Sequence, residues 1–164
     1  MPSRRNQIEL TPEEQQDVLS QGRTLYVATN GHDGYPHMVA MWYVPIDGNI
    51  HFATFRKSQK VLNIQRDPRI TVILESGLAY NELRALVIKG TAELVDDLDL
   101  TKRVLTLSGM RAGLAAAGKS AAVDPQMPIT IGAGVEAQAT KRVTVRITPD
   151  HIYSWDHSKL GGRY

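Results

Sequence analysis

The chain has 164 residues, 42% of them hydrophobic, and its 19 basic against 17 acidic residues give a formal net charge of +2. This length suits one globular domain, residues 1–164, and so small a positive excess argues against a protein built to bind nucleic acid. The absence of cysteine excludes disulfides, thiolate catalysis and Cys-ligated metals. No apolar leader or membrane-length apolar run occurs, so we expect a cytoplasmic protein that does not bind membranes.

The first half of the chain predicts a helix followed by strands. Thr11, Pro12 and Glu14 form a capping-box pattern with proline at the first helical position, which predicts a helix over residues 12–20. Three β-branched and aromatic runs follow, separated by turn signals such as Asp47-Gly48, and they predict an antiparallel meander. The strands of this meander are expected at residues 23–30, 37–46 and 49–55.

The second half predicts further strands with helices inserted between them. A helix is expected over 58–66, because Ser58 is a favourable N-cap and Pro68 must end it. Residues 118–139 are small, polar and proline-punctuated, which indicates a covering loop or an irregular insertion. The remaining expected elements are strands at 69–76 and 82–96 with a bulge or bend at Gly90, a helix at 97–117, strands at 141–149 and 151–156, and a polar tail at 157–164.

Six or so antiparallel strands with inserted helices predict a mostly β fold, either a small barrel or a strongly curled sheet with added helices. Residues 131–137 match the G-x-G-x-x-A dinucleotide fingerprint, but too few residues follow for its helix and no βαβ unit surrounds it. The histidines lack metal-binding spacing, and no serine lies in a G-x-S-x-G motif. We therefore expect no metal, and no catalytic residue can be named from the sequence.

An anion site is suggested by the stretch ATFRKSQK, residues 53–60. Arg56, Lys57 and Lys60 surround the first turn of the helix predicted at 58–66. Cations there oppose the positive end of the helix dipole, unless an anion such as phosphate lies between them and the free amides. A solvated basic turn is the competing interpretation, and the spacing alone leaves both open.

An apolar wall adjoins this stretch. Residues 37–43 and the strand ending at Phe52–Thr54 lead to the same helix, so a planar ring could lie on the wall while its phosphate reaches the helix. Ordinary core packing is the competing interpretation for Met38, Met41 and Trp42.

These residues together carry a family resemblance. The order strand, Asp-Gly turn, strand, then residues 53–60 and Arg66-Asp67-Pro68-Arg69, resembles the pyridoxamine 5'-phosphate oxidase-like family, an FMN-binding-protein-like split β-barrel. Residues 82–84 and 154–162 are similar to its flavin/deazaflavin oxidoreductase branch. The resemblance covers roughly residues 10–156, which would form the domain core.

The resemblance implies a homodimer with two cofactor sites at the subunit interface. It assigns the cofactor ring to the strand Met38, Val39, Ala40, Met41, Trp42 and Tyr43, with Ala53 and Thr54 on the next strand. It assigns the phosphate to Lys57, Ser58, Gln59 and Lys60. Trp155 and Lys159 would either reach the cofactor or pack at the dimer seam.

Two departures bear on the cofactor. The oxidase carries an arginine and a lysine where this sequence has Met38 and Tyr43, which argues against a pyridoxamine-phosphate oxidase. The cations gather instead at Arg56, Lys57 and Lys60, which resembles the deazaflavin-using branch and favours coenzyme F-420 over FMN. The function implied is hydride transfer between coenzyme F-420 and a small conjugated organic substrate. An FMN-dependent oxidoreductase of the same fold, and a non-catalytic flavin- or pyridoxal phosphate-binding protein, remain alternatives.

Overall fold

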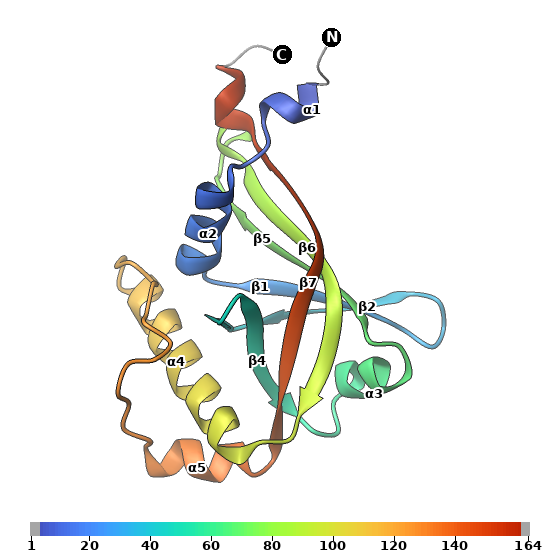
Figure 1. Ribbon diagram of the computed structural model, residues 1–164, viewed down its shortest axis with the longest axis vertical. Helices are drawn as coiled ribbons and strands as arrows, with labels where there is room; N and C mark the ends of the chain where they lie inside the picture. The colour runs from blue at the N-terminus through green and yellow to red at the C-terminus, as the bar shows by residue number, and fades with distance from the viewer. Residues whose placement is uncertain (1–3, 162–164) are drawn as a thin grey trace.

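The structure, a computed structural model, describes residues 4–161. The long strands β6 and β7 run through the whole molecule, and helices lie on its flanks (Figure 1). The elements in chain order are α1 (Arg4–Gln7), α2 (Pro12–Gln21), β1 (Leu25–Asn30), β2 (Pro36–Met41), β3 (Val44–Ile46), β4 (Asn49–Phe55), α3 (Gln59–Arg66), β5 (Arg69–Ser76), the 3-10 turn η1 (Tyr80–Glu82), β6 (Arg84–Val95), α4 (Leu98–Ala116), α5 (Ala133–Ala139), β7 (Arg142–Asp156) and the 3-10 turn η2 (His157–Leu160).

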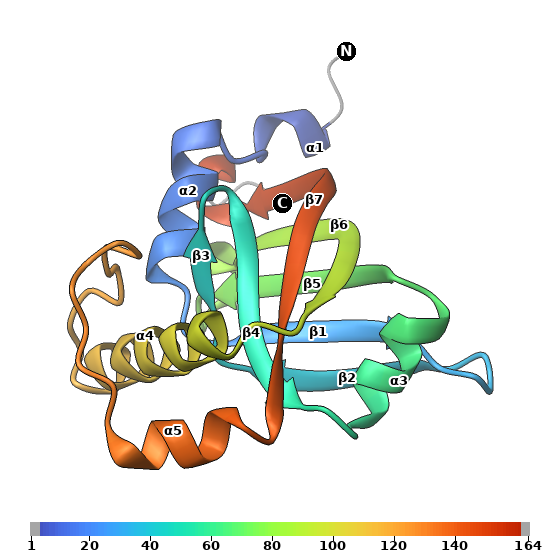
Figure 2. The same cartoon turned by 60° about the horizontal axis from the view of Figure 1, so that its bottom comes forward.

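The seven strands form one antiparallel sheet in the order β2-β1-β5-β6-β7-β4-β3. Only Trp42 and Tyr43 separate β2 from β3 in the chain, although these strands lie at opposite edges of the sheet. The short connection draws the two edges together, so the sheet curls into a barrel that is split between them (Figure 2). The predicted mostly β fold, a split barrel with added helices, is confirmed.

The predicted meander of three strands is wrong. Residues 37–46 form two strands, because β2 pairs with β1 whereas β3 pairs with β4. The chain leaves the sheet at Trp42, whose side chain is exposed, and at Tyr43, which is buried. Alternating apolar residues predict extended backbone, but they do not reveal where a strand changes its partner.

The two strands predicted at 141–149 and 151–156 are one strand, β7. Pro149 lies opposite Gly90, where the pairing of β6 with β7 shifts register. A proline has no N–H for the ladder and is tolerated at such an irregularity. A Cβ on Gly90 would lie 2.4 Å from the Thr148 carbonyl oxygen, so the close approach of the strands requires glycine. The bulge predicted at Gly90 is thereby confirmed.

Several local predictions are also confirmed. The Thr11 Oγ1 accepts a hydrogen bond from the Glu14 amide at 3.3 Å, and the Thr11 amide donates to Glu14 Oε2 at 2.7 Å, which completes the capping box of α2. Asp47 and Gly48 have φ values of 49° and 77°, as a two-residue hairpin turn between β3 and β4 requires.

Within the segment 118–139, predicted as a loop or an irregular insertion, residues 133–139 form the helix α5.

The core has two parts. Side chains of β1, β4, β5, β6 and β7 fill the barrel, and α3 closes one barrel end with Ile64 in this cluster. A smaller cluster joins Val44 and Ile46 of β3 to Val104 and Leu107 of α4 on the outer side of the barrel. Across residues 4–161, no helix is both long and apolar enough to cross a membrane.

Candidate functional site

The ammonium group of Lys60 is buried at the barrel end that α3 closes. Lys60 is only 8% exposed, and its Nζ donates a hydrogen bond to Thr54 Oγ1 on β4 at 3.0 Å. Within residues 4–161 it forms no ion pair, and burial lowers its pKa. A buried cation with two spare donors and no counter-ion is chemically suited to bind an anion.

The first turn of α3 lies beside this ammonium group. Ser58 is the N-cap residue of α3, but its hydroxyl lies 3.3 Å from Thr54 Oγ1 and does not cap a helix amide. The N-terminus of α3 therefore keeps free amides next to Lys60, Thr54 and Ser58. The amides, the hydroxyls and the ammonium group together provide hydrogen-bond donors suited to a phosphate group.

The other residues of the predicted phosphate site are more open. Lys57 and Gln59 are exposed, and the Gln59 side-chain amide donates to Asn63 Oδ1 at 2.9 Å. Arg56 forms an ion pair with Asp96 at 2.5 Å, so this cation is already neutralised. Of the three cations in ATFRKSQK, only Lys60 is buried without a charge partner in the described chain.

Two polar residues that the sequence did not single out lie near α3. The buried Asn63 donates from Nδ2 to Thr29 Oγ1 at 3.0 Å. His37 of β2 is the strand partner of Thr29, and its Nδ1 is buried without a hydrogen-bond partner in the described chain. Their positions depend on the pairing of β1 with β2, so no local sequence motif could have identified them.

A pocket of about 430 Å³ lies on the other side of β4, where α4 and α5 cover the split. Figure 2 shows β2 running from the side of α4 and α5 to the side of α3. The volume falls within the range of small-molecule sites. The pocket is lined by Ala40, Met41, Trp42, Ala53, Leu105, Ser108, Val135, Gln138 and Arg142.

The pocket and the Lys60 site use opposite faces of β4. Thr54 bonds to Lys60, whereas the preceding residue, Ala53, packs toward α4 and lines the pocket. Successive side chains of a strand alternate between its faces. A molecule that occupied both places would pass through the split beside β2, where β4 extends beyond the end of the short strand β3.

The predicted ring strand presents its side chains in two directions. Met38, Ala40 and Trp42 face outward, and Met38 and Trp42 are about 60% exposed. Val39 and Met41 are partly buried against the barrel core. Tyr43 is 1% exposed, and its hydroxyl donates to the Leu19 carbonyl oxygen at 2.6 Å. The Tyr43 side chain is thus part of the core, and it is not available to a ligand in this structure.

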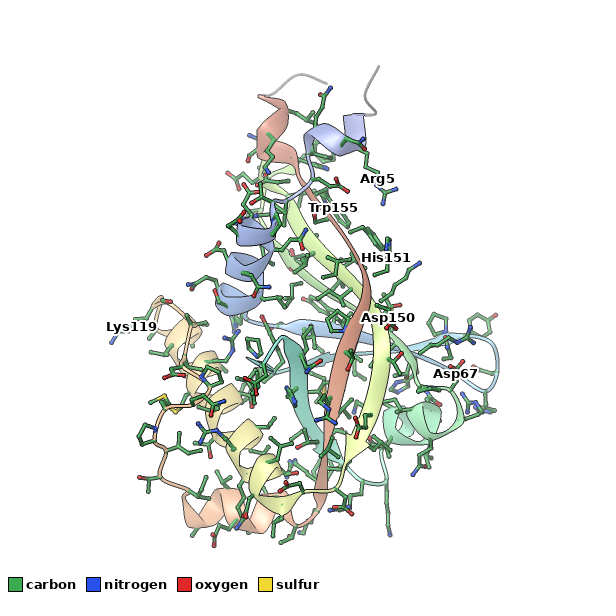
Figure 3. The ribbon with its side chains drawn as sticks, in the orientation of Figure 1. Arg5, Asp67, Lys119, Asp150, His151 and Trp155 are labelled. Atoms are coloured by element: carbon green, nitrogen blue, oxygen red, sulfur yellow. The ribbon has the colours of Figure 1, made fainter. Side chains whose placement is uncertain are left out.

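Trp155 and Lys159 are not brought to the site within one chain. Trp155 lies thirteen residues beyond Arg142 on β7, about 40 Å along the strand. Figure 3 shows it beside α1, far from Asp67 at the end of α3. The Nζ of Lys159 donates to Glu14 Oε2 and to the Glu9 carbonyl oxygen. Either residue could reach a cofactor only across a subunit interface.

A second hollow, of about 460 Å³, lies over β1, β5, β6 and β7. Of its two cations, Arg69 forms an ion pair with Asp67, and the Lys89 Nζ lies 6.0 Å from the centre of the Tyr153 ring. The Asp67 ion pair holds the pKa of that carboxyl well below its usual range. Among residues 4–161 there is also no group of three His, Asp or Glu side chains that could hold a metal.

The curled antiparallel sheet, split along one side, defines a split β-barrel protein, and Lys60 is buried at the barrel end that α3 closes. Over residues 11–156 the sequence matches the pyridoxamine 5'-phosphate oxidase family, and the chain belongs to that family. A search of curated proteins found no match.

Solved structures agree with this assignment. A conserved hypothetical protein from Mycobacterium tuberculosis, Rv2991, is 38% identical, with a TM-score of 0.77 over 98% of this chain and 93% of its own. An F420 reductase is 22% identical, with a TM-score of 0.64 over 87% and 98% of the two chains. A FAD-binding protein from Mesorhizobium loti is 20% identical, with a TM-score of 0.60 over 89% and 94%. The last two likenesses concern the fold.

Proposed function

We propose that the protein is an oxidoreductase that binds the deazaflavin coenzyme F-420 and acts on a small conjugated organic substrate. The observation that carries this proposal is the buried ammonium group of Lys60, which has no charge partner in the described chain. Keeping such a group costs stability, and a bound phosphate offsets that cost. The fit of the donors around Lys60 to a phosphate supports a phosphate-bearing cofactor of either the deazaflavin or the flavin type.

Two groups of residues would contact the cofactor, one at its phosphate and one at its ring. Lys60, Thr54 and Ser58, with the first amides of α3, would hold the phosphate. The wall formed by Ala40, Met41 and Trp42 of the split, with Ala53 opposite, would orient a flat ring system and exclude water from it. When bound, the deazaflavin supplies the hydride chemistry, and the protein contributes binding and orientation.

The preference for coenzyme F-420 over FMN rests on two positions. The family resemblance places cations of the oxidase at residues 38 and 43, and this chain has an exposed methionine and a buried tyrosine there. Neither side chain offers a charge to the phosphate or the ring of FMN. The similarity in fold to an F420 reductase is consistent with this choice.

Equilibrium titration with coenzyme F-420 and with FMN tests the proposal. Wild type should bind the deazaflavin more tightly, and Lys60→Ala should weaken binding by roughly 10- to 100-fold, as expected for loss of a charge-assisted hydrogen bond. Lys119→Ala is the control, since Lys119 is an exposed lysine outside the predicted phosphate site. Unchanged affinity in Lys60→Ala, or no binding of either cofactor to wild type, would contradict the proposal.

We further propose that two copies associate through the outer face of β1 and β2. Tyr26 and Ala40 are strand partners, so Tyr26, Met38, Ala40 and Trp42 share one face. Tyr26, Met38 and Trp42 are all substantially exposed, which leaves a contiguous apolar surface beside the split. A second copy would cover this surface and could bring Trp155 or Lys159 to the neighbouring cofactor site.

A further inference from the structure

The guanidinium group of Arg142 is held in the pocket beneath α5. Its Cζ lies 4.1 Å from the centre of the Phe55 ring, and one terminal nitrogen donates to the Gln138 carbonyl oxygen at 3.1 Å. The side chain is partly buried and lines the pocket. The aromatic ring and the last turn of α5 thus fix the orientation of this cation before any ligand arrives.

Arg142 has unused hydrogen-bonding capacity. A guanidinium group carries five N–H donors, and within residues 4–161 only the bond to Gln138 occupies one of them. It also has no carboxylate partner in this part of the chain, in contrast to Arg56, Arg84 and Arg146. A fixed, unpaired guanidinium group is suited to receive a carboxylate through two parallel hydrogen bonds.

The rest of the pocket is largely apolar, and its lining includes the aromatic residue Trp42. Trp42, Ala53 and Leu105 contribute apolar surface, and Ser108 and Gln138 add polar atoms near the helices. A ligand that satisfied the whole pocket would combine a planar apolar body with one anionic group.

Arg142 and Lys60 lie on opposite sides of the sheet. Arg142 of β7 is the strand partner of Phe55 of β4, and its guanidinium group stacks on the Phe55 ring. Its side chain therefore lies on the side of the sheet to which Ala53 and Phe55 point. Lys60 bonds to Thr54, on the opposite face. A phosphate bound to Lys60 does not reach Arg142 through these faces, so Arg142 stays available to a second anionic group.

We infer that this pocket binds the substrate as a planar conjugated carboxylate beside the cofactor ring, with the carboxylate on the Arg142 guanidinium group. The inference rests on the proposed function, because it names the substrate class of that oxidoreductase. It also assigns a role to α5, whose last turn holds Arg142 in place and whose Val135 covers the pocket.

Binding of 2-naphthoate and its neutral amide, 2-naphthamide, to the full chain tests the inference by calorimetry. Wild type should prefer the acid by roughly tenfold or more, as expected for a charge-assisted pair. Arg142→Gln should abolish this preference, and Arg142→Lys should retain part of it, because the charge remains but the planar fork is lost. Lys141→Gln is the control, since the neighbouring Lys141 is exposed and does not line the pocket.

Cofactor titrations of the same variants separate this inference from the proposed function. Arg142→Gln should weaken the binding of coenzyme F-420 and of FMN much less than Lys60→Ala does, because Arg142 shares the pocket with the ring but lies on the opposite face of β4 from the phosphate donors. Equal binding of acid and amide by wild type, a preference that survives in Arg142→Gln, or a parallel loss of cofactor affinity would overturn the inference. If wild type binds neither cofactor yet discriminates acid from amide through Arg142, the proposed function fails and the carboxylate site stands.

Discussion

The guanidinium group of Arg111 lies over the ring of Tyr43, with its Cζ 4.7 Å from the ring centre. Arg111 is 3% exposed, and its terminal nitrogens donate to carbonyl oxygens of Leu19, Ser20 and Gly22, and of Ala121. One side chain of α4 thus satisfies the C-terminal end of α2, where a cation is favourable. It also supports the residue at which the chain passes from β2 to β3.

Removing Arg111 should destabilise the protein strongly. Arg111→Met leaves several buried carbonyl oxygens without donors, so we expect the free energy of unfolding to fall by about 2–4 kcal/mol. Tyr43→Phe removes only the hydroxyl bond to Leu19 and should cost about 1 kcal/mol. Urea unfolding of both variants measures these changes. Near-wild-type stability of Arg111→Met would show that the carbonyl oxygens find other donors.

Gly22 is required beside this pair. A Cβ on Gly22 would lie 2.6 Å from the Tyr43 hydroxyl oxygen and 2.8 Å from the Val18 carbonyl oxygen. Its φ of −58° is open to any residue, so the constraint is the close approach rather than the backbone conformation. The contact explains why the end of α2 can pack so closely on the β2–β3 connection.

Lys60 should oppose stability while supporting binding. Burial disfavours its charged form and lowers its pKa, so Lys60→Met should raise the free energy of unfolding of the ligand-free protein by about 1 kcal/mol or more. The same substitution should weaken phosphate-bearing cofactors. Thermal unfolding without ligand, with Lys57→Met as the control, measures the first effect. A lower stability of Lys60→Met would mean that its bond to Thr54 outweighs the cost of burial.

His51 should make stability depend on pH below neutrality. Burial first, and then the positive charge of Arg146, lower the pKa of His51 in the folded state from its ordinary 6.5. The unfolded chain therefore takes up the proton first, and the stabilising difference, present above pH 6.5, is lost as the pH falls through the folded pKa. Urea unfolding between pH 7.5 and about 5 should show a shallower decline for His51→Gln than for wild type. An equal decline in stability for wild type and His51→Gln would show that His51 does not cause this pH dependence.

The outer face of β1 and β2 should control oligomeric state. Tyr26→Lys places a charge in the centre of the exposed apolar surface, at a residue that does not line the pocket, and should convert a dimer to a monomer. Leu62→Lys is the control, because Leu62 is 50% exposed but belongs to α3. Light scattering after size-exclusion chromatography gives the mass. A monomeric wild type at micromolar concentration would contradict the proposed association.

Local chemistry explains which elements could be predicted from the sequence. The capping box of α2, the Asp47-Gly48 turn and the stop at Pro68 act through neighbouring residues, and the structure has each of them. Lys60 was singled out for the same reason, since it lies in the first turn after a good N-cap. The family and the split-barrel class followed from the order of these signals along the chain.

The sequence by itself determined most of the elements, the mostly β class and the cationic turn at the start of α3, because propensities, caps and turns depend on residues a few positions apart. Only the tertiary structure decided that residues 37–46 divide between two strands, that Tyr43 enters the core beneath Arg111, and that Arg142 meets a pocket built from β2, β4, α4 and α5. These outcomes depend on which strands pair and which faces the helices cover. Contacts between residues about 90 positions apart produce no periodic pattern in the sequence of either segment, so they cannot be predicted from it.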